Sequence, residues 1–155
     1  MIAAIDIADD AWASVVDLER LTERAIGAAL AHARADPNVE IGVLFASDAE
    51  AARLNTEWRR KDYAPNILSF PAPQTLDVPE GEPKPLGDLI LAAGTVTREA
   101  EEQGKPLTSH LTHLIVHGAL HLLGFDHIEE RDAERMEAAE IAILAGLGVE
   151  DPYNA

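Results

Sequence analysis

Residues 117–127 read HGALHLLGFDH, which is the most informative stretch of the sequence. It contains His117, His121 and His127. On an α-helix, His117 and His121 are one turn apart and project from the same face. Two imidazoles placed in this way can both reach one metal ion at about 2.0–2.1 Å. The spacing therefore predicts a metal site whose first two ligands lie on one helix.

The third histidine reaches the same metal only if the chain reverses. A helix that continued past His121 would carry His127 about 9 Å further along the axis. Gly124 predicts the end of the helix, because glycine adopts the left-handed conformation that a C-terminal cap requires. Three nitrogen ligands leave one position for water, as in catalytic rather than structural zinc sites. We therefore expect one zinc ion per chain, although nickel or copper would also accept imidazole.

Other polar residues near this stretch have two interpretations each. His113 shares the inner face of the helix and is a candidate to support a ligand, whereas His32 and His110 are more simply core or surface residues. Asp126 is either a group that orients a ligand imidazole or a turn residue.

The surrounding pattern predicts an α+β fold in a single domain over residues 1–155, with a four-stranded mixed sheet and about five helices, one of them a metzincin-like metal helix. Short apolar runs predict strands at 2–7, 39–46, 66–70 and 86–92. Helical spacing predicts helices at 17–32, 47–60, 95–103, 108–123 and 129–147. Ser47 or Asp48 is the expected N-cap of the second of these helices and Thr108 that of the fourth, and Gly148 ends the last helix. Residues 71–87 are rich in proline and predict an exposed connection.

Composition excludes several classes of protein. The chain has no cysteine, so disulfides and thiolate metal ligands are excluded. No segment approaches the roughly 20 apolar residues of a membrane span, so no membrane partner is expected. The N-terminal MIAAIDIADD lacks the basic start of a signal peptide, and we expect a cytoplasmic protein.

The net charge of −16 argues against a nucleic-acid partner, because an acidic surface repels polyanions. Against this, Arg59, Arg60 and Lys61 are consecutive and could form a local positive field. Alternatively, these cations form a solvated helix end, where they complement the helix dipole.

The histidine spacing is that of the metzincin peptidases, whose motif is H-E-x-x-H-x-x-G-x-x-H. Gly124 and His127 match this motif, but Gly118 stands where the peptidases have their general-base glutamate. Glycine cannot take a proton from water. A zincin-like peptidase is therefore the less favoured alternative.

The whole stretch HGALHLLGFDH resembles the signature of the YbeY family, bacterial single-strand endoribonucleases that mature ribosomal RNA. A second match, LNTEWRRKDYAPNILSFP at residues 54–71, resembles the family's arginine-bearing helix and the strand after it. A third is LGD at residues 86–88. Together the matches span Val39 to about Ala145.

The resemblance implies that His117, His121 and His127 bind zinc and that Arg59 is the family's functional arginine, with Arg59 and His117 as catalytic residues. It implies hydrolysis of single-stranded RNA in 16S rRNA 3′-end maturation and ribosome quality control, with the small ribosomal subunit and assembly proteins as partners. Arg60 stands where glycine is common and Pro65 where threonine is common, so Arg60 stays an alternative to Arg59 for facing the substrate. A non-catalytic assembly factor stabilised by zinc is the other alternative.

Overall fold

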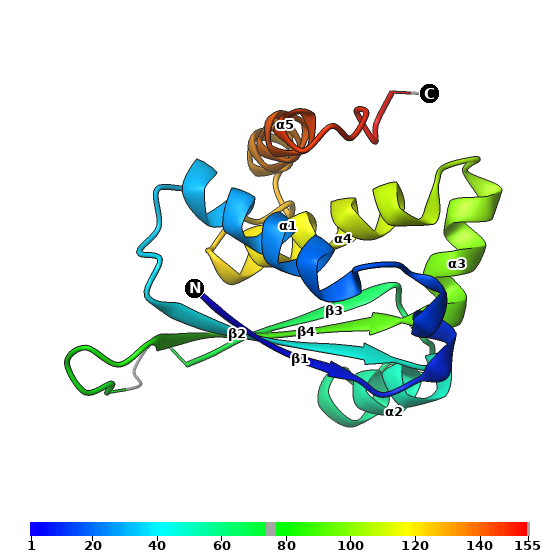
Figure 1. Ribbon diagram of the computed structural model, residues 1–155, viewed down its shortest axis with the longest axis horizontal. Helices are drawn as coiled ribbons and strands as arrows, with labels where there is room; N and C mark the ends of the chain where they lie inside the picture. Colours follow the sequence, from blue (N-terminus) through cyan, green and yellow to red (C-terminus); the bar gives the residue numbers. More distant parts are fainter. Residues whose placement is uncertain (74–76, 155) are drawn as a thin grey trace.

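The computed structural model describes residues 1–73 and 77–154. Within these residues the chain forms one four-stranded sheet, five α-helices and a short 3-10 helix (Figure 1). The strands are β1 (Ile2–Ile7), β2 (Val39–Ala46), β3 (Ile67–Pro71) and β4 (Lys84–Ala92). The helices are η1 (Asp10–Ser14), α1 (Leu18–His32), α2 (Asp48–Arg59), α3 (Ala93–Glu102), α4 (Leu107–Leu122) and α5 (Glu130–Gly146). The predicted α+β class is confirmed.

The sheet is mixed, with strand order β1-β2-β4-β3. Strands β1, β2 and β4 are parallel, and β3 pairs antiparallel with β4 along one edge. A parallel pair needs a long crossover connection, which α1 supplies between β1 and β2. Helices α1, α4 and α5 lie on one side of the sheet and α2 lies on the other (Figure 1).

Side chains of the inner strands alternate between two apolar layers, as expected for strands covered on both faces. The larger layer, shared with α1, α4 and α5, contains Ile41, Val43, Phe45, Leu89 and Leu91. The smaller layer, on the α2 side, contains Ala46, Ala51, Leu68, Ile90 and Ala92. Burying a side chain such as leucine contributes about 1.5–3 kcal/mol. Helix α4 gains most from the larger layer, because it buries Leu111, Ile115, Val116, Ala119 and Leu120.

Most predicted helix ends agree with the structure, and one is wrong. The Ser47 hydroxyl accepts a hydrogen bond from the Glu50 N–H at 3.1 Å, which confirms it as an N-cap. Gly148 has φ of +77°, which confirms the end of α5. Thr108, however, lies inside the first turn of α4, and Pro106 occupies the cap position. Proline fits next to a helix start because the N–H groups there lack helical partners in any case.

Two further features differ from the prediction. Helix η1 was not expected; it buries Trp12, whose indole N–H donates to the Ala46 carbonyl at 2.9 Å. Strand β4 begins at Lys84, so the connection expected over residues 71–87 is shorter. Residues 74–76 of that connection lie outside the described residues.

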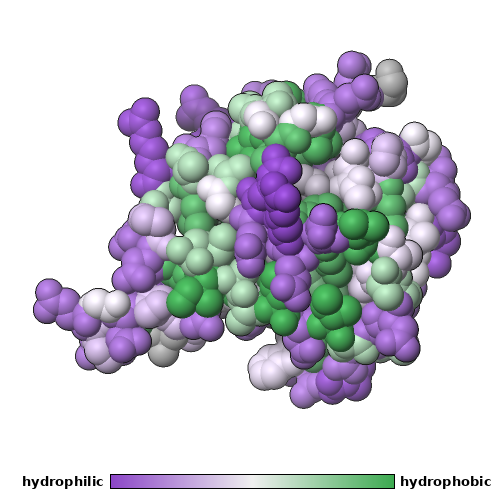
Figure 2. Space-filling model, viewed as in Figure 1, coloured by the Kyte–Doolittle hydropathy of each residue, from purple (hydrophilic) through white to green (hydrophobic). Residues whose placement is uncertain are grey.

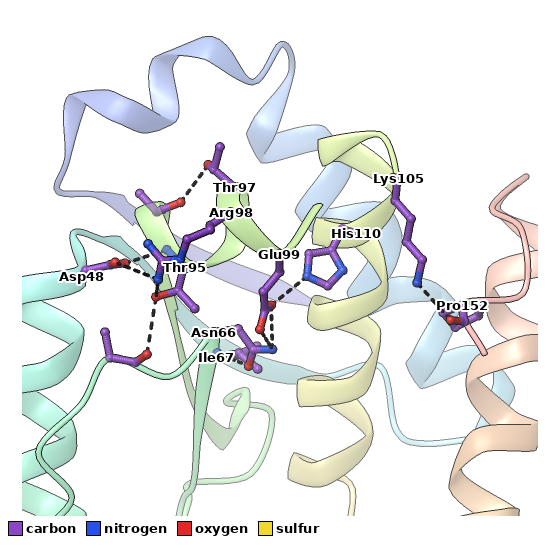
Figure 3. A network of polar contacts seen from close by, with 12 residues as sticks. Asp48, Asn66, Ile67, Thr95, Thr97, Arg98, Glu99, Lys105, His110 and Pro152 are labelled. Atoms are coloured by element: carbon purple, nitrogen blue, oxygen red, sulfur yellow. Dashed lines mark hydrogen bonds and ion pairs between the residues drawn. The ribbon is translucent and has the colours of Figure 1, made fainter. Parts of the chain in front are cut away.

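A polar network joins α2, α3, α4 and the start of β3 (Figure 3). Asp48 accepts a hydrogen bond from the Thr95 N–H at 2.9 Å and so caps α3, which itself has no side-chain cap at residue 92. Glu99 lies between the Asn66 amide, at 3.0 Å, and the His110 Nε2, at 2.9 Å. His110 is therefore a core residue, which was the simpler of its two interpretations.

The face drawn in Figure 2 shows hydrophobic groups interrupted by hydrophilic side chains. None of the described helices has the length and apolar character that crossing a membrane requires.

Gly87 sets the distance between β4, β3 and α4. Its φ of +141° is rarely adopted by other residues. A Cβ atom there would collide with the Phe70 carbonyl oxygen and would lie 2.9 Å from both Pro71 Cα and Leu122 Cδ2. Leu122, the last residue of α4, therefore packs against β4 at a position where the strand has no side chain.

Gly87→Ala should accordingly lower the free energy of unfolding by at least about 2 kcal/mol, from overpacking and backbone strain. Gly27→Ala is the matched control, since Gly27 lies within α1 and a Cβ atom added there would meet no other atom within 4 Å. It should raise stability by about 0.5–1 kcal/mol through helix propensity. Urea denaturation measures both, and equal stability of the two variants would contradict the close packing around Gly87.

Candidate metal centre

Helix α4 carries His113, His117 and His121 on one face, at the four-residue spacing predicted from the sequence. The Nε2 atoms of His117 and His121 face each other at 3.1 Å, and their ring centroids are 4.7 Å apart. Both side chains are partly buried, so the pair lies at the border between core and solvent.

The chain reverses at Gly124, as predicted. Gly124 has φ of +96°, and its N–H donates to the His121 carbonyl at 3.0 Å. The Phe125 N–H donates to the Leu120 carbonyl at 2.9 Å, which completes the paired hydrogen bonds of a glycine-terminated helix. His127 returns as a result, with its ring centroid 5.0 Å from that of His121 and 5.7 Å from that of His117.

Asp126 is a turn residue. Its Oδ1 accepts hydrogen bonds from the backbone N–H of His127, at 2.6 Å, and of Ile128, at 3.1 Å. This holds the loop that presents His127, and it is the second of the two roles considered for Asp126.

The three histidines fit a metal ion. One ring nitrogen from each of His117, His121 and His127 lies within 4.8 Å of the others. Burial, and then the neighbouring His117 and His127, lower the pKa of His121, which favours the neutral form that a metal needs. Three imidazole nitrogens suit zinc, nickel or copper.

Sequence reasoning missed the carboxylate behind these histidines. Glu140 of α5 is fully buried, and its Oε1 lies 2.9 Å from His117 Nδ1 and 2.8 Å from His113 Nε2. The Tyr153 hydroxyl donates to Oε2 at 2.8 Å. The sequence did contain a signal that Glu140 is buried, because its spacing places it on the apolar face of α5 with Met136 and Leu144.

Glu140 is ionised in this environment. Burial raises the pKa of its carboxyl, but hydrogen bonds with His113, His117 and Tyr153 outweigh burial and hold the pKa at about 2. Burial and Glu140 itself raise the pKa of Tyr153, so the phenol keeps its proton. His113 is thus hydrogen-bonded to the same oxygen as His117, in line with the supporting role considered for it.

Arg59 ends α2 and lies against the edge strand. Its Nη2 donates to the Ser69 carbonyl at 2.5 Å, and its guanidinium carbon is 5.1 Å from the centroid of the Phe70 ring. The other side of Ser69 faces α4, where its Oγ is 3.2 Å from the position a Cβ of Gly118 would take. Ser69 therefore lies between Arg59 and the neighbour of His117.

Arg60 contributes to the turn after α2. It has φ of +57°, and its N–H donates to the Thr56 carbonyl at 3.0 Å. This left-handed conformation favours glycine, the residue that is common at this position in the family the sequence resembles. Arg59, rather than Arg60, makes the side-chain contacts with β3.

Gly118 allows α4 to approach the sheet closely. A Cβ atom at this position would lie 2.8 Å from Ile67 Cδ1 and from Leu89 Cδ2. A glutamate at residue 118 would have to enter space that these side chains already fill. The packing therefore strengthens the sequence argument against a zincin-like peptidase.

The α2 side of the sheet contains a groove of about 860 Å³. Trp58, which precedes Arg59, lines it and is 68% exposed. Phe70 adds a second aromatic ring, and Asp6 and Asp88 add negative charge.

His32, at the exposed end of α1, does not belong to the histidine cluster.

Comparison with known proteins gives a consistent result. The family model described as endoribonuclease YbeY matches residues 5–148. The endoribonuclease YbeY of Azorhizobium caulinodans is 47% identical over 150 residues, which cover 95% of this chain and 92% of that protein. That of Erythrobacter litoralis is 49% identical over 154 residues, covering 94% and 91%.

The fold is also similar to that of a Thermotoga maritima protein solved in solution. Its TM-score is 0.58 at 21% identity, over 99% of this chain and 100% of that one, a likeness that concerns the fold alone. The family model and the two relatives confirm the resemblance found in the three sequence motifs. This chain belongs to the YbeY family of endoribonucleases.

Proposed function

We propose that this protein is a zinc-dependent endoribonuclease that hydrolyses phosphodiester bonds of single-stranded RNA. The observation that carries the proposal is the convergence of His117, His121 and His127 nitrogens within 4.8 Å, in a member of an endoribonuclease family. A single domain over residues 1–155 carries the activity in this proposal.

The three histidines would hold zinc, which when bound supplies Lewis-acid activation of the phosphodiester and of water. His117 and His121 are partly buried, and His127 lies on the exposed side, where substrate and water can approach. His117 directs Nε2 to the centre because its Nδ1 contacts Glu140. We therefore assign His117 to the catalytic residues as well as to the ligands.

Arg59 would bind the phosphate whose negative charge grows during hydrolysis. A guanidinium offers a planar fork of donors that matches phosphate oxygens. The contacts with Ser69 and Phe70 fix its position in advance, and preorganised donors stabilise developing charge without reorganisation. The only side-chain hydrogen bond of Arg59 with the described residues uses Nη2, which leaves other N–H groups for phosphate.

Trp58 supports a single-stranded substrate. This residue, next to Arg59 in the chain, is 68% exposed, and base–aromatic stacking contributes about 1–3 kcal/mol per base. Unpaired bases can offer a free face to such a ring, whereas bases in a duplex are stacked on their neighbours. The local positive charge of Arg59, Arg60 and Lys61 adds attraction for the backbone.

We further propose ribosomal RNA as the substrate, in 16S rRNA 3′-end maturation and ribosome quality control, in the cytoplasm. The net charge of −16 suits the basic proteins of the small ribosomal subunit and its assembly factors. The groove that combines apolar side chains with Asp6 and Asp88 has the chemistry for such a partner.

A non-catalytic assembly factor, stabilised by zinc, is the competing function. Removal of zinc by a chelator distinguishes the two: RNA processing that continues unchanged would favour the assembly factor. A fluorogenic peptide assay with zinc-loaded protein tests the peptidase alternative.

Protein purified without chelator should contain about one metal ion per chain. His117→Ala, His121→Ala and His127→Ala should each lose most of it, together with cleavage of single-stranded RNA, because each removes one of three ligands. Elemental analysis and a gel assay on single-stranded and duplex RNA measure both. His32→Ala is the control and should keep its metal, while full occupancy in His127→Ala would refute the three-ligand site.

Arg59→Ala should keep the metal and the fold but lose most RNA cleavage, and Arg59→Lys should recover only part, since an ammonium cannot make the bidentate contact. Arg60→Gly should remain active and be more stable by about 1 kcal/mol, because glycine removes the left-handed strain. Cleavage rates and thermal unfolding measure these effects. An inactive Arg60→Gly beside an active Arg59→Ala would transfer the role to Arg60.

Binding to bare RNA should be weak and should depend little on salt. The proposal places the zinc ion and the cations at residues 59–61 at the site, while the net charge of −16 repels phosphate from the surface as a whole. With three phosphate contacts on a single strand, the slope of log K against log salt is about −2. Titration of a single-stranded oligonucleotide measures this slope. Nanomolar affinity with a slope of about −6 would reveal a much larger basic surface and contradict a site with three phosphate contacts.

A further inference from the structure

Glu140 has partners on both carboxylate oxygens. Oε1 faces His113 Nε2 and His117 Nδ1, and Oε2 accepts the hydrogen bond of Tyr153. Its side chain is only 1% exposed, and an ionised carboxylate is costly to bury unless such partners are present. The partners come from α4 and from the segment after α5, so this arrangement joins three parts of the chain.

The contact with Glu140 determines which nitrogen of His117 carries the proton. A neutral imidazole has one N–H donor and one lone pair, and a carboxylate can only accept. With Glu140 2.9 Å from Nδ1, the proton lies on Nδ1 and the lone pair on Nε2. Nε2 is the atom that faces His121 at 3.1 Å. The hydrogen bond thus aims the lone pair of His117 at the centre of the histidine cluster.

The segment that carries Tyr153 is held by a contact with the chain before α4 and by a turn of its own. Lys105, just before α4, donates from Nζ to the Pro152 carbonyl at 3.0 Å (Figure 3). Asp151 Oδ1 accepts from the Tyr153 N–H at 2.8 Å. The Tyr153 ring also meets the edge of His113, with centroids 5.5 Å apart. These contacts fix the phenol behind Glu140.

We propose that Glu140, held by Tyr153, is a positioning residue of the metal centre: it fixes the tautomer and ring orientation of His117 and makes the C-terminal segment part of the site. The inference rests on the proposed ligation by His117, His121 and His127. It extends that site to residues that do not touch the metal, because a carboxylate behind a ligand imidazole both orients it and raises its basicity.

The chain offers a matched control in Glu99 and His110. His110 also lies on α4, is buried, and has its Nε2 2.9 Å from a carboxylate oxygen of Glu99 (Figure 3). It is not in the histidine cluster. Glu99→Gln therefore disturbs another pair of a carboxylate and an α4 histidine, with Glu99 on α3 and 30% exposed, without touching the proposed ligands.

Metal affinity is the direct readout, measured by competition between the metal-free protein and a chromophoric chelator, with zinc and with cobalt. Glu140→Gln and Glu140→Ala should weaken affinity by about 10-fold to 100-fold, with the larger loss in alanine, which cannot orient His117 at all. Tyr153→Phe should give a smaller loss in the same direction, and the cobalt absorption spectrum should change in all three. Glu99→Gln should keep the wild-type affinity and spectrum.

A second measurement does not depend on how the variants fold. In the metal-free wild type, ¹⁵N-detected NMR of the histidine rings should show His117 protonated on Nδ1. Tyr153→Phe alters a half-exposed side chain near the chain end, so it tests the proposal even if the variants of buried Glu140 unfold.

The possible results separate the two proposals. Absence of metal binding by the wild type would refute the metal site itself. Wild-type binding with unchanged affinity in Glu140→Gln and Tyr153→Phe, an equal loss in Glu99→Gln, or a proton on Nε2 of His117 would each overturn the positioning role alone. His113, His117 and Glu140 are themselves close enough to hold an ion. If the wild type bound two metal ions per chain and Glu140→Gln bound one, Glu140 would be a ligand, and the positioning role would be overturned.

Discussion

The close contact between α4 and the sheet determines the geometry of the whole site. Gly118 brings the helix so near to the sheet that a Cβ atom at this position would lie 2.8 Å from the terminal methyl groups of Ile67 and Leu89. Because the helix has 3.6 residues per turn, fixing this face against the sheet also fixes the direction of His117 and His121. The same rotation aims His117 Nδ1 at α5, where Glu140 Oε1 lies at hydrogen-bond distance. If α4 lay further from the sheet, it could not keep both the direction of His117 and His121 and the contact between His117 and Glu140.

Negative and positive charges near the site lie in separate parts of the molecule. Glu140 concentrates negative charge behind the histidines, where burial and hydrogen bonds keep it from solvent and substrate. The positive side chains of residues 59–61 lie on the exposed end of α2, beyond Ser69. An overall charge of −16 is therefore compatible with a phosphate at the site, since a field falls off within about 8 Å in physiological salt. Attraction is local, whereas repulsion acts on any longer stretch of RNA.

The sequence predicted those features that depend on neighbours within a few residues. The spacing of His117 and His121 and the stop at Gly124 are properties of one helix and its cap, and the structure has both. Glu140 and Tyr153 could not be placed in this way, because their meeting with His117 depends on how α5 packs on α4. The same holds for η1, whose Trp12 is stabilised by β2 across the fold, and for the cap of α3, which Asp48 supplies from another helix. The wrong cap at Thr108 has a local cause: a hydroxyl residue is a common N-cap, but Pro106, two residues earlier, also fits a helix start and occupies the cap position.

The end of α2 shows how local strain and long-range contact cooperate. Arg60 takes a left-handed conformation that most residues avoid, at a cost of about 1–2 kcal/mol. That conformation ends the helix at Arg59 and sends the following chain towards β3, whose Ser69 carbonyl then accepts the hydrogen bond from Arg59. A glycine at residue 60 would allow the same turn without strain. The turn, rather than the second arginine side chain, is thus what residue 60 contributes to the position of Arg59 beside β3, the strand that contacts α4.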